Sequence, residues 1–105
     1  MSYSTKNDIL EQLDEGVLIQ LTDDDDLGGV DDDVVARAIA DADALIDSYC
    51  GTRYSVPFST VPDIVRKLSV EIAIFHLYGR RRGAPEDRRK RYDDAVSFLV
   101  FISVF

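Results

Sequence analysis

The chain has 105 residues, a formal net charge of -8 and a composition of 46% hydrophobic and 30% charged residues. This composition fits one folded domain with a modest core and excludes a disordered chain. The single cysteine, Cys50, excludes an intramolecular disulfide and a cysteine zinc cluster, and favours a reducing compartment. The N-terminus lacks the pattern of a signal peptide, and no segment approaches the roughly 20 apolar residues of a membrane span, so we expect a soluble intracellular protein.

The first segments are short. Thr5 can cap a first helix, in which apolar residues recur at helical spacing until Gly16 is expected to interrupt it. Residues 17–21, VLIQL, are predicted to form a short helical turn or a buried run. Residues 22–33 contain seven aspartates and two adjacent glycines. Because like charges repel and glycine loosens the backbone, this segment is predicted to be a solvated loop.

The clearest amphipathic pattern covers residues 33–50, where apolar residues recur every three or four positions and aspartates take the other faces. Asp31 or Asp32 can cap the start of this helix, and Gly51 suits the position that follows its end. Residues 52–62 contain two prolines and predict an extended connector.

Two more helices follow the connector. Residues 62–81 are apolar around much of the helix, which predicts a central position, and Pro62 suits the first turn. Gly83 breaks this helix, and Pro85 opens another that extends to about residue 103.

These segments predict an all-α fold, a small bundle of four to five helices in one domain spanning residues 1–105. The extended connector lies between the second and third main helices. We find no alternating strand pattern longer than a few residues and no internal repeat. The helical spacing predicts a core that includes Ile39, Leu45, Ile46, Leu68, Ile72, Phe75, Tyr92 and Leu99.

The aspartate loop partly resembles a calcium-binding EF-hand loop, with Asp23, Asp25 and Gly28 at the first, third and sixth positions. Leu27 and Val34 occupy the fifth and twelfth positions, which should supply oxygen ligands. A solvated loop with a helix cap is therefore favoured over a specific calcium site, and weak surface binding of cations stays open.

Other candidate sites have structural explanations. The sole histidine, His76, lies in an apolar helix and is expected to be packed, since no second histidine is available for zinc. Cys50 is best explained as a small buried hydrophobe, and Glu71 as paired or exposed. No glycine-rich phosphate loop or paired nucleophile is recognisable. We therefore expect no enzyme activity, metal, cofactor or small-molecule substrate.

The charge is unevenly distributed, since residues 1–64 carry -12 and residues 65–105 carry +4. Seven of the twelve basic residues form an arginine-rich arm, which consists of Arg80, Arg81, Arg82, Arg88, Arg89, Lys90 and Arg91. Three interpretations of the arm stay open: a solvated hairpin with i, i+4 pairs such as Glu86 to Lys90 and Asp87 to Arg91, a contact for an acidic partner surface, or a nucleic-acid site. The acidic net charge argues mildly against nucleic acid. We expect the arm to contact the acidic loop at Asp23 to Asp33 of a neighbouring subunit, or a comparable acidic partner surface. The candidate residues of the loop are Asp23, Asp24, Asp25 and Asp26.

The last eight residues, FLVFISVF, are apolar at every position except Ser103. An exposed helix face is not expected to have this composition. We therefore expect Phe98, Phe101 and Phe105 to bury against another subunit or another chain.

Four segments in this order resemble the Mu-like phage and prophage head–tail connector (head completion) family. They are DILEQLDEGVLIQLTD, DDDVVARAIADADALIDSYCGTRYSVPF, VPDIVRKLSVEIAIFHLYGRR and PEDRRKRYDDAVSFL, and they extend over nearly all of residues 7–99. The resemblance implies an all-helical structural protein that assembles as a ring at the portal vertex, contacts neighbouring head and tail proteins and catalyses nothing. It also implies a location in the host cytoplasm and then in the virion.

Members of that family continue past the RYDDA helix with a more polar segment, whereas this sequence ends at Phe105 after an apolar run. The C-terminal part is therefore expected to be truncated or altered relative to the family. A closed ring requires two unlike faces, which suits a chain with one acidic and one basic half. Two alternatives stay open: a small helical nucleic-acid-binding protein that uses the arm, and an adaptor that binds another protein without self-assembly.

Overall fold

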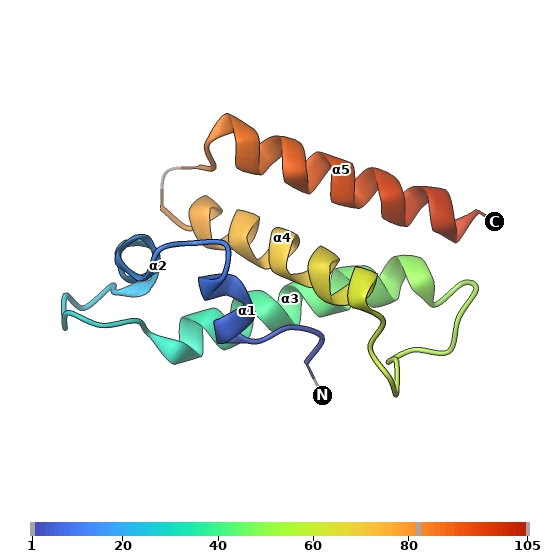
Figure 1. The fold of residues 1–105 in the computed structure, drawn as a ribbon, viewed down its shortest axis with the longest axis horizontal. Helices are drawn as coiled ribbons and strands as arrows, with labels where there is room; N and C mark the ends of the chain where they lie inside the picture. The colour runs from blue at the N-terminus through green and yellow to red at the C-terminus, as the bar shows by residue number, and fades with distance from the viewer. Residues whose placement is uncertain (1, 82, 105) are drawn as a thin grey trace.

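The computed structural model describes residues 2–81 and 83–104. Within these ranges the chain forms helices and connecting segments without strands, which confirms the predicted all-α fold (Figure 1). The helices are α1 (Lys6–Leu10), α2 (Glu15–Thr22), α3 (Asp32–Cys50), α4 (Asp63–Gly79) and α5 (Glu86–Ser103). None of the described helices is both long enough and apolar enough to cross a membrane.

The three long helices form the body of the fold, with α4 between α3 and α5 (Figure 1). The short helices α1 and α2 each contact both α3 and α4. The predicted central position of α4 is confirmed, because its buried residues lie on several faces, among them Val70, Ile72, Ala73 and Leu77. The apolar side chains around this helix therefore pack against neighbouring elements on more than one side.

The first helix ends earlier than predicted. Thr5 caps α1 as expected, and Asp8 completes a capping box by accepting from the Thr5 amide at 2.9 Å. The predicted break at Gly16 is wrong, because Gly16 is the second residue of α2. A glycine costs less here than in a helix interior, since amides of the first turn have no intrahelical partner. The chain breaks instead between α1 and α2, where Leu13 turns into the core with 7% of its surface exposed.

The ends of the longer helices largely follow the predicted signals. The Asp31 carboxylate caps α3 by accepting from the amides of Asp33 and Val34 at 3.0 and 3.3 Å. Gly51 follows α3 but keeps a helical φ of -61°, so the left-handed ending that glycine permits is not used. Gly83 adopts a φ of 85°, and α5 begins directly after Pro85.

Five of the eight predicted core residues are buried: Ile39, Ile46, Leu68, Ile72 and Leu99. Full burial of the other three was a wrong prediction. Leu45 is half-buried, because the core face of α3 passes through Ile46 rather than its neighbour. Phe75 and Tyr92 are half-buried because they stack on each other between α4 and α5, with ring centroids 4.0 Å apart.

Candidate interaction surfaces

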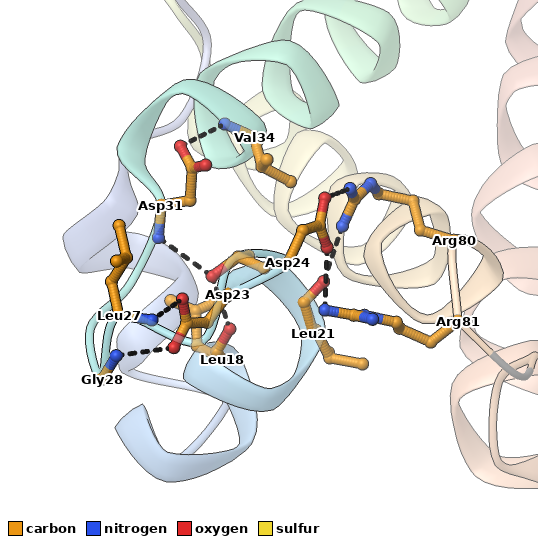
Figure 2. A network of polar contacts seen from close by, with 11 residues as sticks. Leu18, Leu21, Asp23, Asp24, Leu27, Gly28, Asp31, Val34, Arg80 and Arg81 are labelled. Carbon is orange, nitrogen blue, oxygen red and sulfur yellow. Dashed lines mark hydrogen bonds and ion pairs between the residues drawn. The ribbon is translucent and has the colours of Figure 1, made fainter.

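The acidic loop, residues 23–31, is more ordered by hydrogen bonds than a simple solvated loop. The Asp23 carboxylate accepts from the backbone amides of Leu27 and Gly28 at 2.8 and 2.7 Å (Figure 2). At the base of the loop, the buried Thr22 hydroxyl accepts from the Asp31 amide at 3.1 Å. These bonds satisfy backbone donors that a turn of this length would otherwise leave to water. The loop therefore has a defined shape.

Asp24 joins this loop to the arginine-rich arm of the same chain. Its carboxylate lies 2.6 Å from Arg80 and 2.7 Å from Arg81, and Arg80 also donates to the Leu21 carbonyl at 2.7 Å (Figure 2). The Arg80 hydrogen bond is the main cause that lowers the pKa of Asp24 from 3.8. These two arginines were expected to meet an acidic loop in a neighbouring subunit, and in the structure they meet one within the chain.

Two further arginines of the arm attach α5 to α4. Arg91 donates to the Glu71 carboxylate at 3.4 Å, and an Arg88 nitrogen lies 3.8 Å from the other oxygen of Glu71. Glu71 and Arg88 are 8% and 12% exposed, and Arg88 also donates to the Gln12 carbonyl at 2.7 Å. The facing atoms Glu71 Oε2 and Arg88 Nη1 are buried without a hydrogen bond. This ion pair is therefore costly to bury and sensitive to the loss of either partner.

The rest of the arm does not form one continuous basic surface. Lys90 pairs with Asp94 at 3.8 Å on the exposed side of α5. Arg89 is exposed, and its side chain makes no ion pair or hydrogen bond with the described residues. Arg82 lies outside the described residues. The hairpin interpretation expected pairs between residues 86 and 90 and between residues 87 and 91, whereas Arg91 bonds to α4 instead.

The apolar end of α5 is only half covered. Ala95 and Leu99 face the core, whereas Phe98 and Phe101 are 39% and 58% exposed. Phe105 lies outside the described residues. Val100 and Val104 are also exposed on this helix end, so the apolar character seen in the sequence exceeds what α3 and α4 bury.

The other candidate residues fit structural roles. Cys50 is buried, as expected, and burial raises the pKa of its thiol. His76 is half-buried, and its lost hydration lowers the pKa of the imidazole. Among the described residues, no three histidine, cysteine or carboxylate side chains are grouped so that they could hold a metal ion.

A polar network at the N-terminus was not recognised in the sequence. The Tyr3 hydroxyl donates to Asp47 at 2.5 Å and accepts from the Phe58 amide at 3.0 Å. Asp43 accepts from the Tyr3 amide and the Ser69 hydroxyl, at 2.9 and 2.8 Å. Burial raises the pKa of Asp43, although the hydrogen bonds from Tyr3 and Ser69 lower it in part. Asp43 and Asp47, four residues apart in α3, are the sequence feature that could have indicated this network. Their partners lie far away in the sequence, so the pattern alone does not identify them.

Comparison with known proteins assigns this helical chain to a family. The family model described as "Bacteriophage Mu, Gp36" matches residues 3–104. "Gene product J" of Escherichia phage Mu is 36% identical over 100 residues, which cover 94% of this chain and 70% of that protein. "Mu-like prophage FluMu protein gp36" of Haemophilus influenzae is 31% identical over 97 residues, which cover 92% of this chain and 67% of that protein. The chain is thus a phage protein and belongs to the Bacteriophage Mu Gp36 family.

Proposed function

We propose that this chain is a non-catalytic structural protein of a Mu-like phage particle, which self-associates at the portal vertex and connects the DNA-filled head to the tail. The observation that carries the proposal is the family match over residues 3–104, together with the connector role that the resemblance of four ordered segments implies. The protein is then made in the host cytoplasm and is incorporated into the virion.

The surface of the molecule supports self-association. A ring forms when one surface of each subunit contacts a different surface of the next. The acidic loop between α2 and α3 and the exposed apolar end of α5 are two unlike surfaces at opposite ends of the molecule (Figure 1). Each is exposed on a scaffold of packed helices, so each is available to a neighbour without unfolding.

The proposal is tested in a Mu-like phage whose copy of this gene is deleted. We expect electron microscopy to show DNA-filled heads and separate tails, and expression of the chain from a plasmid to restore joined particles. Joined particles in the absence of the protein would contradict the proposal. A block before DNA is packaged would also contradict it, because a connector acts after the head is filled.

Nucleic-acid binding gains less support as an alternative. Four residues of the arm, Arg80, Arg81, Arg88 and Arg91, bond to carboxylates of the same chain. Contacts to phosphates would require these bonds to break or would depend on the few cations that remain.

A further inference from the structure

A groove of about 290 Å³ lies between α4 and α5. Its apolar lining comes from Ile64 and Leu68 of α4 and from Ala95 and Phe98 of α5. Ile64 and Phe98 are 46% and 39% exposed, although isoleucine and phenylalanine are usually buried. The groove therefore offers apolar surface that the fold itself leaves uncovered.

One cation in the lining of the groove is left without an ion-pair partner among the described residues. Lys67 and Arg91 line it together with the carboxylates of Glu71 and Asp94. Both carboxylates are already paired, since Glu71 contacts Arg88 and Arg91, and Lys90 contacts Asp94. Arg88 and Lys90, which pair with these carboxylates, lie outside the lining, and Lys67 is the lining charge without an ion pair within the described part of the chain. A complementary ligand has an apolar group beside negative charge.

Leu27, in the acidic loop, has these properties. It is 83% exposed, more than any other large hydrophobic residue that the structure describes. It lies on the side of the loop away from Arg80 and Arg81 (Figure 2). The Asp23 carboxylate holds its amide, and neighbouring Asp26 adopts a left-handed φ of 57°. The hydrogen bond restrains the backbone at Leu27, which lowers the entropy lost on binding.

Two aspartates beside Leu27 are available for a partner. Asp25 and Asp26 are exposed, and neither makes an ion pair or a side-chain hydrogen bond with the described residues. Asp23 and Asp24, in contrast, are engaged by backbone amides and by arginines of their own chain. The negative charge that remains lies next to the exposed leucine.

We propose that Leu27 of one subunit inserts into the α4–α5 groove of a second copy of this chain, with Asp25 and Asp26 next to Lys67 and Arg91. This contact deepens the proposed self-association and rests on it. Leu27 contributes the apolar contact. The opposite charges orient the loop in the groove and disfavour orientations that bring like charges together.

The geometry makes this contact head to tail. The acidic loop lies at one end of the 45 Å long axis, whereas the start of α4 and the second half of α5 lie toward the other (Figure 1). A subunit whose loop fills a neighbour's groove still has its own groove free. Repetition of the same contact therefore closes a ring or extends a chain of subunits.

The test compares three variants of the full chain. Leu27→Arg removes the inserted group, and Phe98→Glu places a carboxylate in the groove where it repels Asp25 and Asp26. Leu27→Met is the matched control, because methionine keeps the apolar contact. We expect sedimentation to show at least about tenfold weaker self-association for the first two variants, because each loses the contact of roughly one buried side chain. The control is expected to associate nearly as strongly as the wild type.

Mixing the two defective variants separates this contact from a symmetric one. The Phe98→Glu chain keeps an intact loop, and the Leu27→Arg chain keeps an intact groove. The mixture is expected to form a one-to-one heterodimer that cannot grow. Wild-type protein that stays monomeric at a concentration on the order of 1 mM, association of Leu27→Arg like the wild type, or a mixture without heterodimer would each overturn the inference.

Phage assembly distinguishes failure of this contact from failure of the proposed function. If Leu27→Arg protein restores joined particles in the gene-deleted phage, the chain is a connector that uses another surface. If joined particles form without any copy of the chain, the connector function itself is wrong.

Discussion

The guanidinium of Arg80 donates to the carboxylate of Asp24 at 2.6 Å, although the two residues are 56 positions apart in the chain. Arg81 contacts the other carboxylate oxygen at 2.7 Å. One side chain of the acidic loop thus holds the C-terminal end of α4 through two consecutive arginines (Figure 2). The loop that we propose as an intermolecular contact is therefore positioned by an intramolecular one.

Asp24→Asn is expected to lower the thermal midpoint and to accelerate cleavage by trypsin after Arg80 and Arg81. Arg80 lowers the pKa of Asp24 below 3.8, so the ion pair stabilises the fold above that pH. Its contribution is lost as pH falls through the lower pKa of the folded state. The wild-type and variant midpoints, followed by circular dichroism, should therefore converge at acidic pH.

The control for this variant is Asp25→Asn, which removes the same charge from a side chain without an ion pair in the described residues. Since Asp24 is 45% exposed, salt should reduce the difference between Asp24→Asn and the wild type. Equal trypsin cleavage of the two variants at low salt would show that Asp24 does not fix the arm.

Glu71→Ala is expected to destabilise the protein by about 3–5 kcal/mol, because it leaves Arg88 buried without a counter-charge. Combining Glu71→Leu with Arg88→Met replaces the pair by apolar side chains and should recover much of this loss. Urea unfolding measures both. A double variant less stable than Glu71→Ala would show that the bond from Arg88 to the Gln12 carbonyl is the larger contribution.

The helical architecture could be predicted because its signals are local. Capping by Thr5 and Asp31, the helix start after Pro85 and the apolar girth of α4 depend on residues close in sequence. The break near Gly16 was misplaced because glycine at the start of a helix costs little. Leu45 was predicted to be buried because periodicity alone cannot separate it from Ile46, whose burial depends on the neighbouring helices.

The pairing of charges could not be predicted in the same way. The sequence shows that Asp24, Glu71 and the arginines are charged, but their partners are fixed by how α2, α4 and α5 pack. Leu27 was noted only as a failed calcium ligand. Its exposure and its conformation follow from the bonds of Asp23, which a sequence pattern does not reveal.

Tyr3→Phe is expected to lower the free energy of unfolding by about 1.5–3 kcal/mol, since it removes a hydrogen bond to the Asp47 carboxylate and leaves the Phe58 amide without its acceptor. Tyr54→Phe is the control, because Tyr54 is exposed and its hydroxyl has no hydrogen bond within the described chain. Equal losses of thermal stability in Tyr3→Phe and Tyr54→Phe would show that the hydrogen bonds of the Tyr3 hydroxyl do not stabilise the fold.

The same network predicts a loss of stability at alkaline pH. Burial, with the hydrogen bond to Asp47 as the next cause, raises the pKa of Tyr3 from 10.0 to about 12. The stabilising contribution of the neutral hydroxyl is complete below pH 10 and is lost as pH rises through about 12. Wild-type protein should lose more stability over this range than Tyr3→Phe.

Leu99→Ala is expected to cost about 2–5 kcal/mol, because this side chain is 0% exposed where α5 packs on the core. The adjacent Val100→Ala serves as its control: Val100 is 45% exposed, and the change should stay within about 0.5 kcal/mol. Similar losses in denaturant unfolding would mean that α5 is rotated relative to the structure.

Duplex DNA binding is expected to be weak and to depend only slightly on salt. Each phosphate contact contributes about -0.9 to the slope of log K against log salt. Arg80, Arg81, Arg88 and Arg91 are paired inside a chain of net charge -8, which leaves Arg89 without an ion pair in the described arm and Lys90 with only an exposed pair to Asp94 at 3.8 Å. Contacts by these two alone would give a slope near about -2.

Fluorescence anisotropy of a labelled duplex between about 0.05 and 0.2 M salt measures this slope. Arg89→Glu with Lys90→Glu should then remove most of the residual binding, because it replaces both cations by charges that repel phosphate. A slope of about -5 or steeper would require the paired arginines to leave Asp24 and Glu71 for phosphate. Such a slope would assign the arm to nucleic acid, and the connector proposal would then depend on the family match over residues 3–104 without support from the arm.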